Sequence, residues 1–222
     1  DRYGIELILG DGAYKNAAIA TAEYFDHPSF AGTYIVDEPG SEQFEELAEI
    51  CREYRKATGG KLPYINLLPM YANAAQLKFG ANAAAIEYYD PDPGLYKKHC
   101  DAFCKMFDVP YICTDIYPLN WVKGKRSTYK NYCESINITA TSAREHNKDF
   151  WCFIQTFAWT SGKRTPTESE FRWQSYCMLS FGCKTLLCWT YAGYNLEFPS
   201  LVGVDGRRSN AWYDAATVFK EI

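Results

Sequence analysis

The stretch Gly32-Thr33-Tyr34-Ile35-Val36-Asp37-Glu38-Pro39 decides how the rest of the chain is interpreted. Its first five residues form a largely apolar, β-branched run that is typical of a buried strand. The run ends in two acids and a proline, which predicts that the strand delivers carboxylates to its carboxyl end, where α/β barrels keep their chemistry. We expect Glu38 to be catalytic and Asp37 to contact the substrate. The alternative is that both acids only cap the following helix, since acids are favourable near a helix start.

The composition indicates a globular chain and disfavours two classes of partner. The 222 residues carry a net charge of -4, and the one basic cluster is the short stretch Lys123-Gly124-Lys125-Arg126. A nucleic-acid partner needs a sustained positive face, so we expect none. No apolar run is long enough to cross a membrane, and we expect no membrane partner. Small neutral substrates fit better, because aromatic residues, 17% of the chain, can stack on sugar rings as well as fill a core.

The nine cysteines show neither CxxC pairs nor metal-ligand spacing. Several lie in strand-like runs, where they behave as small apolar residues. This usage favours reduced thiols and a cytoplasmic location, but the chain opens at Asp1 without a methionine. We therefore expect a piece of a longer protein whose localisation signals are missing, and leave the location unknown. The three histidines, His27, His99 and His146, assemble no metal triad or Ser-His-Asp set, so we expect no metal and no cofactor.

Short apolar runs alternate with helical patterns along the chain, as in a parallel sheet covered on both faces. The predicted strands are Ile5–Gly10, Gly32–Val36, Leu62–Leu68, Val109–Thr114, Phe150–Thr156 and Thr185–Tyr191. One predicted helix begins at Gly40-Ser41 and ends at Gly59-Gly60. Another begins with the capping box Thr167 and Glu170 and ends near Gly182.

Polar or aromatic residues follow every predicted strand, which favours a closed (β/α)8 barrel over an open doubly wound sheet. They are Asp11, Glu38, Asn66 with Tyr71, Asp115 with Tyr117, Gln155, and Trp189 with Tyr191. A barrel recruits functional residues from all strands around a ring, whereas an open sheet concentrates them at one switch point. No GxGxxG or GxxxxGK[ST] loop follows a strand. We therefore expect residues 1–222 to form one partial TIM barrel of about six βα units, because a complete barrel needs about 250 residues.

With the strand ends laid out, the pattern resembles the clan A glycoside hydrolases, TIM-barrel enzymes that cleave O-glycosidic bonds. The likeness covers most of the chain and is carried by four stretches: His27–Tyr34 leading into Asp37-Glu38-Pro39, Tyr64–Pro69, Asp115–Pro118, and Phe150–Gln155. In that clan the fourth strand ends in an Asn-Glu-Pro-like signature whose glutamate is the acid/base. The resemblance implies this role for Glu38, with Asp37 in place of the asparagine.

One position departs from the clan pattern. The resemblance implies a glutamate nucleophile at the end of the seventh strand, where this chain has Gln155. A retaining mechanism needs two carboxyl groups about 5 Å apart, and a neutral amide cannot replace one. Asp115 could instead act as base in an inverting mechanism, with the pair about 6.5 to 9.5 Å apart. Otherwise Glu197 or missing amino-terminal strands could supply the carboxylate, or the protein could bind sugars without cutting them.

The remaining candidate residues have ordinary structural explanations beside the functional ones. Asp115 could merely cap a turn. The aromatic candidates Tyr117, Tyr191, Trp189 and Trp159 could be core residues rather than partners of sugar hydroxyls and ring faces. Asn66 and Gln155 are amides suited to reading hydroxyl groups. We expect a glycoside hydrolase acting on a saccharide, with a non-catalytic carbohydrate-binding barrel as the alternative and an unrelated barrel enzyme as a third possibility.

Overall fold

The computed structural model describes residues 4–10, 22–83, 91–158, 162–193 and 200–222. The chain divides into two compact units. Unit 1 comprises Asp1–Cys113 and Thr141–Asp149, and unit 2 comprises Thr114–Ala140 and Phe150–Ile222. The predicted candidates Asp11, Trp159 and Glu197 lie outside the described residues.

All six predicted strands are present, with ends shifted by a few residues. They are β1 (Leu7–Gly10), β2 (Phe30–Asp37), β3 (Leu62–Asn66), β4 (Tyr111–Asp115), β7 (Asp149–Gln155) and β8 (Cys183–Trp189). The recorded pairings of β1 with β2, β2 with β3 and β7 with β8 are parallel, as the apolar runs predict. The expected α/β class with parallel sheets is therefore confirmed.

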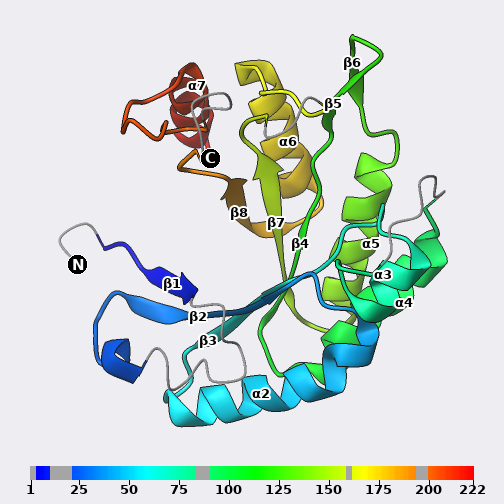
Figure 1. The fold of residues 1–222 in the computed structure, drawn as a ribbon, viewed down its shortest axis with the longest axis vertical. Coiled ribbons are helices and arrows are strands. Elements are labelled where there is room, and N and C mark those ends of the chain that lie inside the picture. The colour runs from blue at the N-terminus through cyan, green and yellow to red at the C-terminus, as the bar shows by residue number, and fades with distance from the viewer. Residues whose placement is uncertain (1–3, 11–21, 84–90, 159–161, 194–199) are drawn as a thin grey trace. The chain divides into compact units, whose positions relative to one another are not determined.

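Unit 1 contains the sheet β1-β2-β3. A short 3-10 turn precedes each of the next two elements: η2 (Ala22–Tyr24) comes before β2, and η3 (Ser41–Gln43) comes before α2 (Phe44–Ala57). Two helices follow β3, namely α3 (Ala74–Phe79) and α4 (Pro93–Met106). Figure 1 shows α2 running along the sheet below β2 and β3. The α2 side chains that recur at helical spacing, among them Phe44, are buried, and Phe44 packs against the rings of Phe103 and Phe107 on and after α4. This aromatic cluster joins α2 to α4 and to the residue that follows α4.

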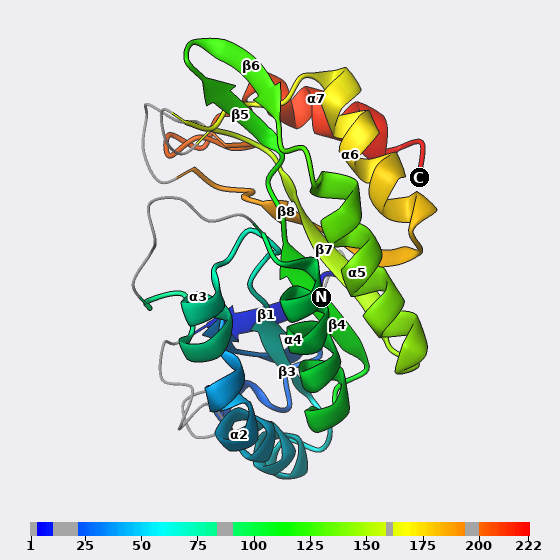
Figure 2. The ribbon, with the colours of Figure 1, turned by 90° about the vertical axis from the view of Figure 1, so that its right-hand side faces the viewer.

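Unit 2 contains most of the sheet β4-β7-β8 and the helices α6 (Glu168–Ser180) and α7 (Asn210–Phe219). The capping box of Thr167 and Glu170 starts α6 as predicted, with Thr167 N donating to Glu170 Oε2 over 3.0 Å. Figure 2 shows α6 and α7 side by side. The boundary between the units falls inside β4, inside α5 (Tyr132–Glu145) and after the first residue of β7, so these three elements belong to the two units in part.

A two-stranded hairpin, β5 (Leu119–Val122) with β6 (Lys125–Thr128), was not predicted. Its turn residues Lys123 and Gly124 both have positive φ, 51° and 70°, as tight hairpin turns require. Figure 2 shows the hairpin as the green pair of strands labelled β5 and β6. Of the three apolar residues of β5, Leu119 is buried, whereas the adjacent Trp121 and Val122 are both exposed, so the regular period-two pattern of a half-buried strand is missing.

The strands of the described residues do not close into a barrel. They hydrogen-bond as two separate three-stranded sheets and the hairpin. Near the end of β3, Leu67 N donates to Cys113 O over 2.9 Å and Ile65 N donates to the hydroxyl of Tyr111 over 2.8 Å. No helix among the described residues combines the length and apolarity needed to span a bilayer.

Candidate functional site

The turn after β2 fixes the backbone of Glu38. Glu38 N donates to Asn66 O over 2.8 Å, and Glu38 O accepts from Ala81 N over 3.1 Å. The residue has a φ of 46°, in the left-handed region, which costs a non-glycine residue about 1 to 3 kcal/mol and needs support from its surroundings. The side chain of Glu38 is half-buried and that of Asp37 is exposed. The sequence Asp-Glu-Pro therefore ends the strand in a turn held on both sides.

Gly40 and Gln43, rather than the two acids, occupy the capping positions of the following helix. Gly40 is the N-cap of η3, and its N–H donates to Gln43 Oε1 over 2.9 Å. A Cβ at Gly40 would lie 2.3 Å from Gly80 N and 2.4 Å from the carbonyl of Lys78. The turn can thus pack on the end of α3 because residue 40 has no side chain.

Asp37 and Asn66 are paired across the sheet, as expected for residues at neighbouring strand ends. They are register partners on β2 and β3, and Asn66 Nδ2 donates to Asp37 Oδ1 over 3.2 Å. Asn66 is buried and Asp37 is exposed, so the carboxylate faces solvent while its amide partner is fixed below it. Together with Glu38 they form a polar group at the carboxyl end of the sheet of unit 1.

A second group lies in unit 2 at the carboxyl end of β4. Asp115 is the last residue of the strand and only 8% exposed, and Tyr117 is also buried. Lys163 Nζ donates to Tyr117 O over 2.8 Å. Burial lowers the pKa of Lys163 to about 8, and the charge of Asp115 opposes this shift. The positive charge of Lys163 and the carboxylate of Asp115 therefore attract each other in this turn.

Backbone pairing holds Lys163 over this turn. Lys163 forms an isolated antiparallel β-bridge with Asn120, and Trp121 N donates to Gly162 O over 2.9 Å. Sequence reasoning missed Lys163 because the residue lies in the loop between β7 and α6, which has no periodic pattern. The available signal was the basic pair Lys163-Arg164 in this loop, since functional residues often lie on loops.

Gln155 is fully buried and its amide is bonded to the backbone of two other segments. Its Oε1 accepts from Leu119 N over 2.9 Å, and its Nε2 donates to Leu119 O over 3.0 Å and to Arg164 O over 2.8 Å. Gln174 on α6 holds the backbone of the same residue, accepting from Gln155 N over 3.0 Å. Gln155 therefore joins the start of β5 to the segment that carries Lys163.

The end of β8 supplies the remaining aromatic candidates. Trp189 is half-buried, and its ring lies edge-on to that of Phe153, with the centroids 6.3 Å apart. Thr156 N donates to Trp189 O over 3.0 Å, which ties the ends of β7 and β8 together. Tyr191 is 61% exposed. The predicted site residues thus form two groups, one in each unit: Asp37, Glu38 and Asn66, and Asp115, Tyr117, Gln155, Trp189 and Tyr191.

Two solved structures share the fold of this chain. The first is a Bacteroides thetaiotaomicron protein provisionally assigned as an alpha-L-fucosidase, with a TM-score of 0.55, 10% identity, and coverage of 94% of this chain and 60% of its own. The second is a GH128 endo-beta-1,3-glucanase from Sorangium cellulosum, with a TM-score of 0.52, 13% identity, and coverage of 95% and 78%. No protein-family model and no curated protein matches the sequence.

Both structural neighbours carry names of glycoside hydrolases. At this level of identity the similarity concerns the fold, and the chain spans 60% of the length of the first neighbour. The sequence resemblance and the two neighbours therefore agree on an α/β fold that proteins named as glycoside hydrolases also have.

The histidines take part in local packing and pairing. His27 Nδ1 accepts from Ser29 N over 3.1 Å, and His99 is buried against the ring of Phe44. His146 Nε2 lies 3.6 Å from Asp101 Oδ1. Within the part of the chain that the structure describes, no group of three His, Cys, Asp or Glu side chains could hold a metal ion.

Proposed function

We propose that this chain is a glycoside hydrolase that cleaves O-glycosidic bonds, with Glu38 as general acid and Asp115 as the second carboxylate. The proposal includes a partial (β/α)8 barrel over residues 1–222 as a single catalytic domain. The observation that carries it is the position of Glu38, in a braced left-handed turn at the carboxyl end of a parallel strand. The two solved glycoside hydrolases of the same architecture support it.

The geometry of the β2 turn supports the role of Glu38. A general acid must be held in one orientation beside the leaving oxygen, because misplacement costs much of the rate. The backbone bonds of Glu38 to Asn66 and Ala81 provide such a fixed base for the side chain. The energetic cost of the left-handed conformation is the kind of strain that clusters at active sites.

The surroundings of Asp115 support its role as the base. A general base must be ionised when it activates water, and the Asp115 carboxylate attracts the positive charge of Lys163. Two carboxyl groups in different environments are the usual way in which a glycosidase separates acid from base. With Gln155 at the position where the clan has its nucleophile, the proposed pair of carboxylates would act by an inverting mechanism.

The other predicted contacts remain part of the proposal. Asp37 and Asn66 would bind sugar hydroxyls beside Glu38, while Tyr117, Trp189 and Tyr191 would bind a sugar in unit 2. Substrate contact by Gln155 also stays a prediction, although the bonds of its amide to Leu119 and Arg164 favour a role in positioning those segments.

The test compares Glu38→Gln and Asp115→Asn on substrates with different leaving groups. The panel begins with alpha-L-fucosides and β-1,3-glucans, the substrates that the names of the neighbours suggest, as alkyl and dinitrophenyl glycosides. Glu38→Gln should lower kcat/KM for alkyl glycosides by roughly 10²- to 10⁴-fold and much less for dinitrophenyl glycosides, whose leaving group needs no proton. Asp115→Asn should slow both.

Glu53→Gln, on the exposed face of α2, is the matched control and should leave both rates unchanged. Equal hydrolysis of alkyl glycosides by wild type and Glu38→Gln would refute the assignment of Glu38. Calorimetric saccharide binding without cleavage of any substrate would instead support the carbohydrate-binding alternative.

A further inference from the structure

Two cysteines of unit 2 have their thiols in contact. Cys133, in the first turn of α5, and Cys177, on α6, lie with their sulfur atoms 3.8 Å apart. Cys133 is exposed and Cys177 is half-buried, and both are reduced. A disulfide has an S–S distance of about 2.05 Å, so the two sulfurs need to approach by less than 2 Å, a change within reach of side-chain rotation.

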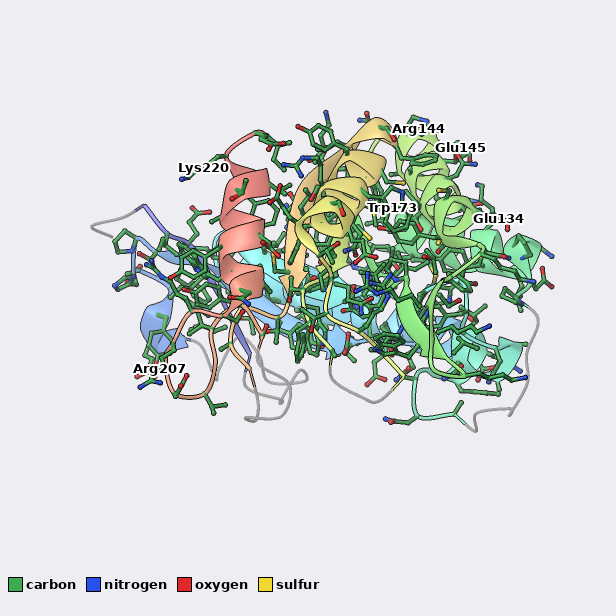
Figure 3. The ribbon with its side chains drawn as sticks, turned by 90° about the horizontal axis from the view of Figure 1, so that it is seen from above. Glu134, Arg144, Glu145, Trp173, Arg207 and Lys220 are labelled. Atoms are coloured by element: carbon green, nitrogen blue, oxygen red, sulfur yellow. The ribbon has the colours of Figure 1, made fainter. Side chains whose placement is uncertain are left out.

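The surrounding residues hold the two helices in the arrangement that brings the thiols together. Tyr132, the neighbour of Cys133, packs its ring against that of Trp173, with the centroids 4.9 Å apart. Trp173 precedes Cys177 by one helical turn, so both lie on the same side of α6. Figure 3 shows Trp173 on the α5 side of α6. The aromatic contact thus aligns the cysteine pair without any help from the sulfurs.

An oxidant can reach the pair from solvent. A shallow hollow on α6 with a volume of about 630 Å³ is lined by Cys177 together with Trp173, Tyr176 and Ser180. Cys133 is itself exposed, so its thiol is the one that meets a soluble reagent first. The other cysteines described are buried, except for half-buried Cys188 on β8.

We propose that Cys133 and Cys177 form a thiol–disulfide exchange site that a small-molecule disulfide of the glutathione class closes into an intramolecular disulfide. The Cys133 thiolate attacks one sulfur of the reagent, forming a mixed disulfide and releasing one thiol. The Cys177 thiolate then attacks the sulfur of Cys133 and releases the second thiol. Two cysteine thiols are oxidised by two electrons in total, and one disulfide is reduced to two thiols, which take up the two protons.

The environment of Cys177 favours the closed form. Burial and the neighbouring Cys133 raise the pKa of Cys177 to about 12. A dithiol is kept reduced when one thiolate is stabilised, and the raised pKa removes that stabilisation here. The second step is intramolecular, so the proximity of the sulfurs offsets the small fraction of Cys177 thiolate. Closure should therefore be slow near neutral pH and faster as the pH rises.

The cross-link would close a long loop. Residues 134–176 lie between the two cysteines and include β7 and the segment that carries Lys163. Closing a loop of this size restricts the unfolded chain, and natural disulfides of this kind raise Tm by roughly 5 to 10 °C in proteins of this length. Oxidation should therefore stabilise unit 2 rather than unfold it.

The experiment treats the folded chain with excess glutathione disulfide, and in parallel with dithiothreitol, then blocks free thiols and digests with trypsin. The expected product joins residues 131–144, which contain Cys133, to residues 173–184, which contain both Cys177 and Cys183. Fragmentation spectra should place the link at Cys177. The oxidised chain should show two fewer free thiols and the Tm rise given above.

Cys133→Ser and Cys177→Ser should each abolish the link and the Tm rise, whereas Cys104→Ala, in unit 1, should retain both. A link through Cys183, stable glutathione adducts on both cysteines without closure, or an unchanged thiol count would each overturn the proposal. Because Cys133 is exposed, Cys133→Ser should fold normally, and its circular dichroism spectrum checks this.

Discussion

Replacing Gln155 with glutamate would introduce a carboxylate at a buried strand end, and the structure predicts that it would destabilise the fold. The amide Nε2 donates to Leu119 O and Arg164 O, and the side chain is fully buried. A carboxylate has no hydrogen to donate to these carbonyls and would face both of them with a negative charge. Gln155→Glu therefore exchanges two hydrogen bonds for two repulsive contacts.

The cost can be worked from these contacts. Each buried carbonyl left without a donor costs about 1 to 3 kcal/mol, and burying the charge adds to this, so we expect a loss of about 3 to 6 kcal/mol at pH 8. Below the ordinary glutamate pKa of about 4.3, the protonated side chain can donate to one carbonyl, which reduces the loss to about 1 to 3 kcal/mol. Because the folded state favours the neutral acid, the stability of this variant should fall as the pH rises.

Urea unfolding followed by tryptophan fluorescence at about pH 3.5 and at pH 8 measures both values. Gln155→Met is the apolar control, which should be destabilised equally at the two pH values. Gln43→Glu is the matched control, because Gln43 Oε1 only accepts from Gly40 N and a carboxylate oxygen can do the same. A Gln155→Glu variant as stable as wild type at pH 8 would refute the structural role of this amide.

Two further predictions concern unit 1. Burial lowers the pKa of His99 to about 4 from an ordinary 6.5. The free energy of unfolding therefore includes up to about 3 kcal/mol above pH 6.5 that is lost as the pH falls through 4. The urea midpoint of His99→Phe should lose this acid dependence, and an unchanged dependence would contradict the prediction. Gly40→Ala should destabilise the chain by about 2 kcal/mol or more, because its Cβ meets the backbone of Lys78 and Gly80. Gly94→Ala, in the first turn of α4 with its nearest contact at 3.3 Å, is the control for thermal melts, and equal Tm values for the two variants would refute the steric argument.

The sequence was sufficient where structure depends on local pattern. The run Gly32–Val36 predicted β2, and the residues at its end were expected beside Asn66 because parallel strands end at the same edge. The capping box of Thr167 and Glu170 predicted the start of α6, because the whole signal lies within four residues of sequence.

The parts that sequence reasoning missed depend on contacts between distant segments. Lys163 reaches the carbonyl of Tyr117, 46 positions away, through a loop without periodic pattern. The amide of Gln155 looks like a candidate for binding sugars until its bonds to Leu119 and Arg164 are seen. Closure of a barrel depends on pairing between whole strands, and the described strands pair in two sheets. Strand patterns alone do not encode which edges meet.

The division of the chain has a consequence for synthesis on the ribosome. Unit 1 is not continuous, because Thr141–Asp149 completes it after the chain has passed through part of unit 2. Asp149 N donates to Pro110 O over 2.8 Å, and Lys148 Nζ donates to Phe107 O over 2.9 Å. The amino-terminal half therefore cannot reach its final set of bonds until residue 149 has left the exit tunnel, and no single cut of the polypeptide releases either unit intact.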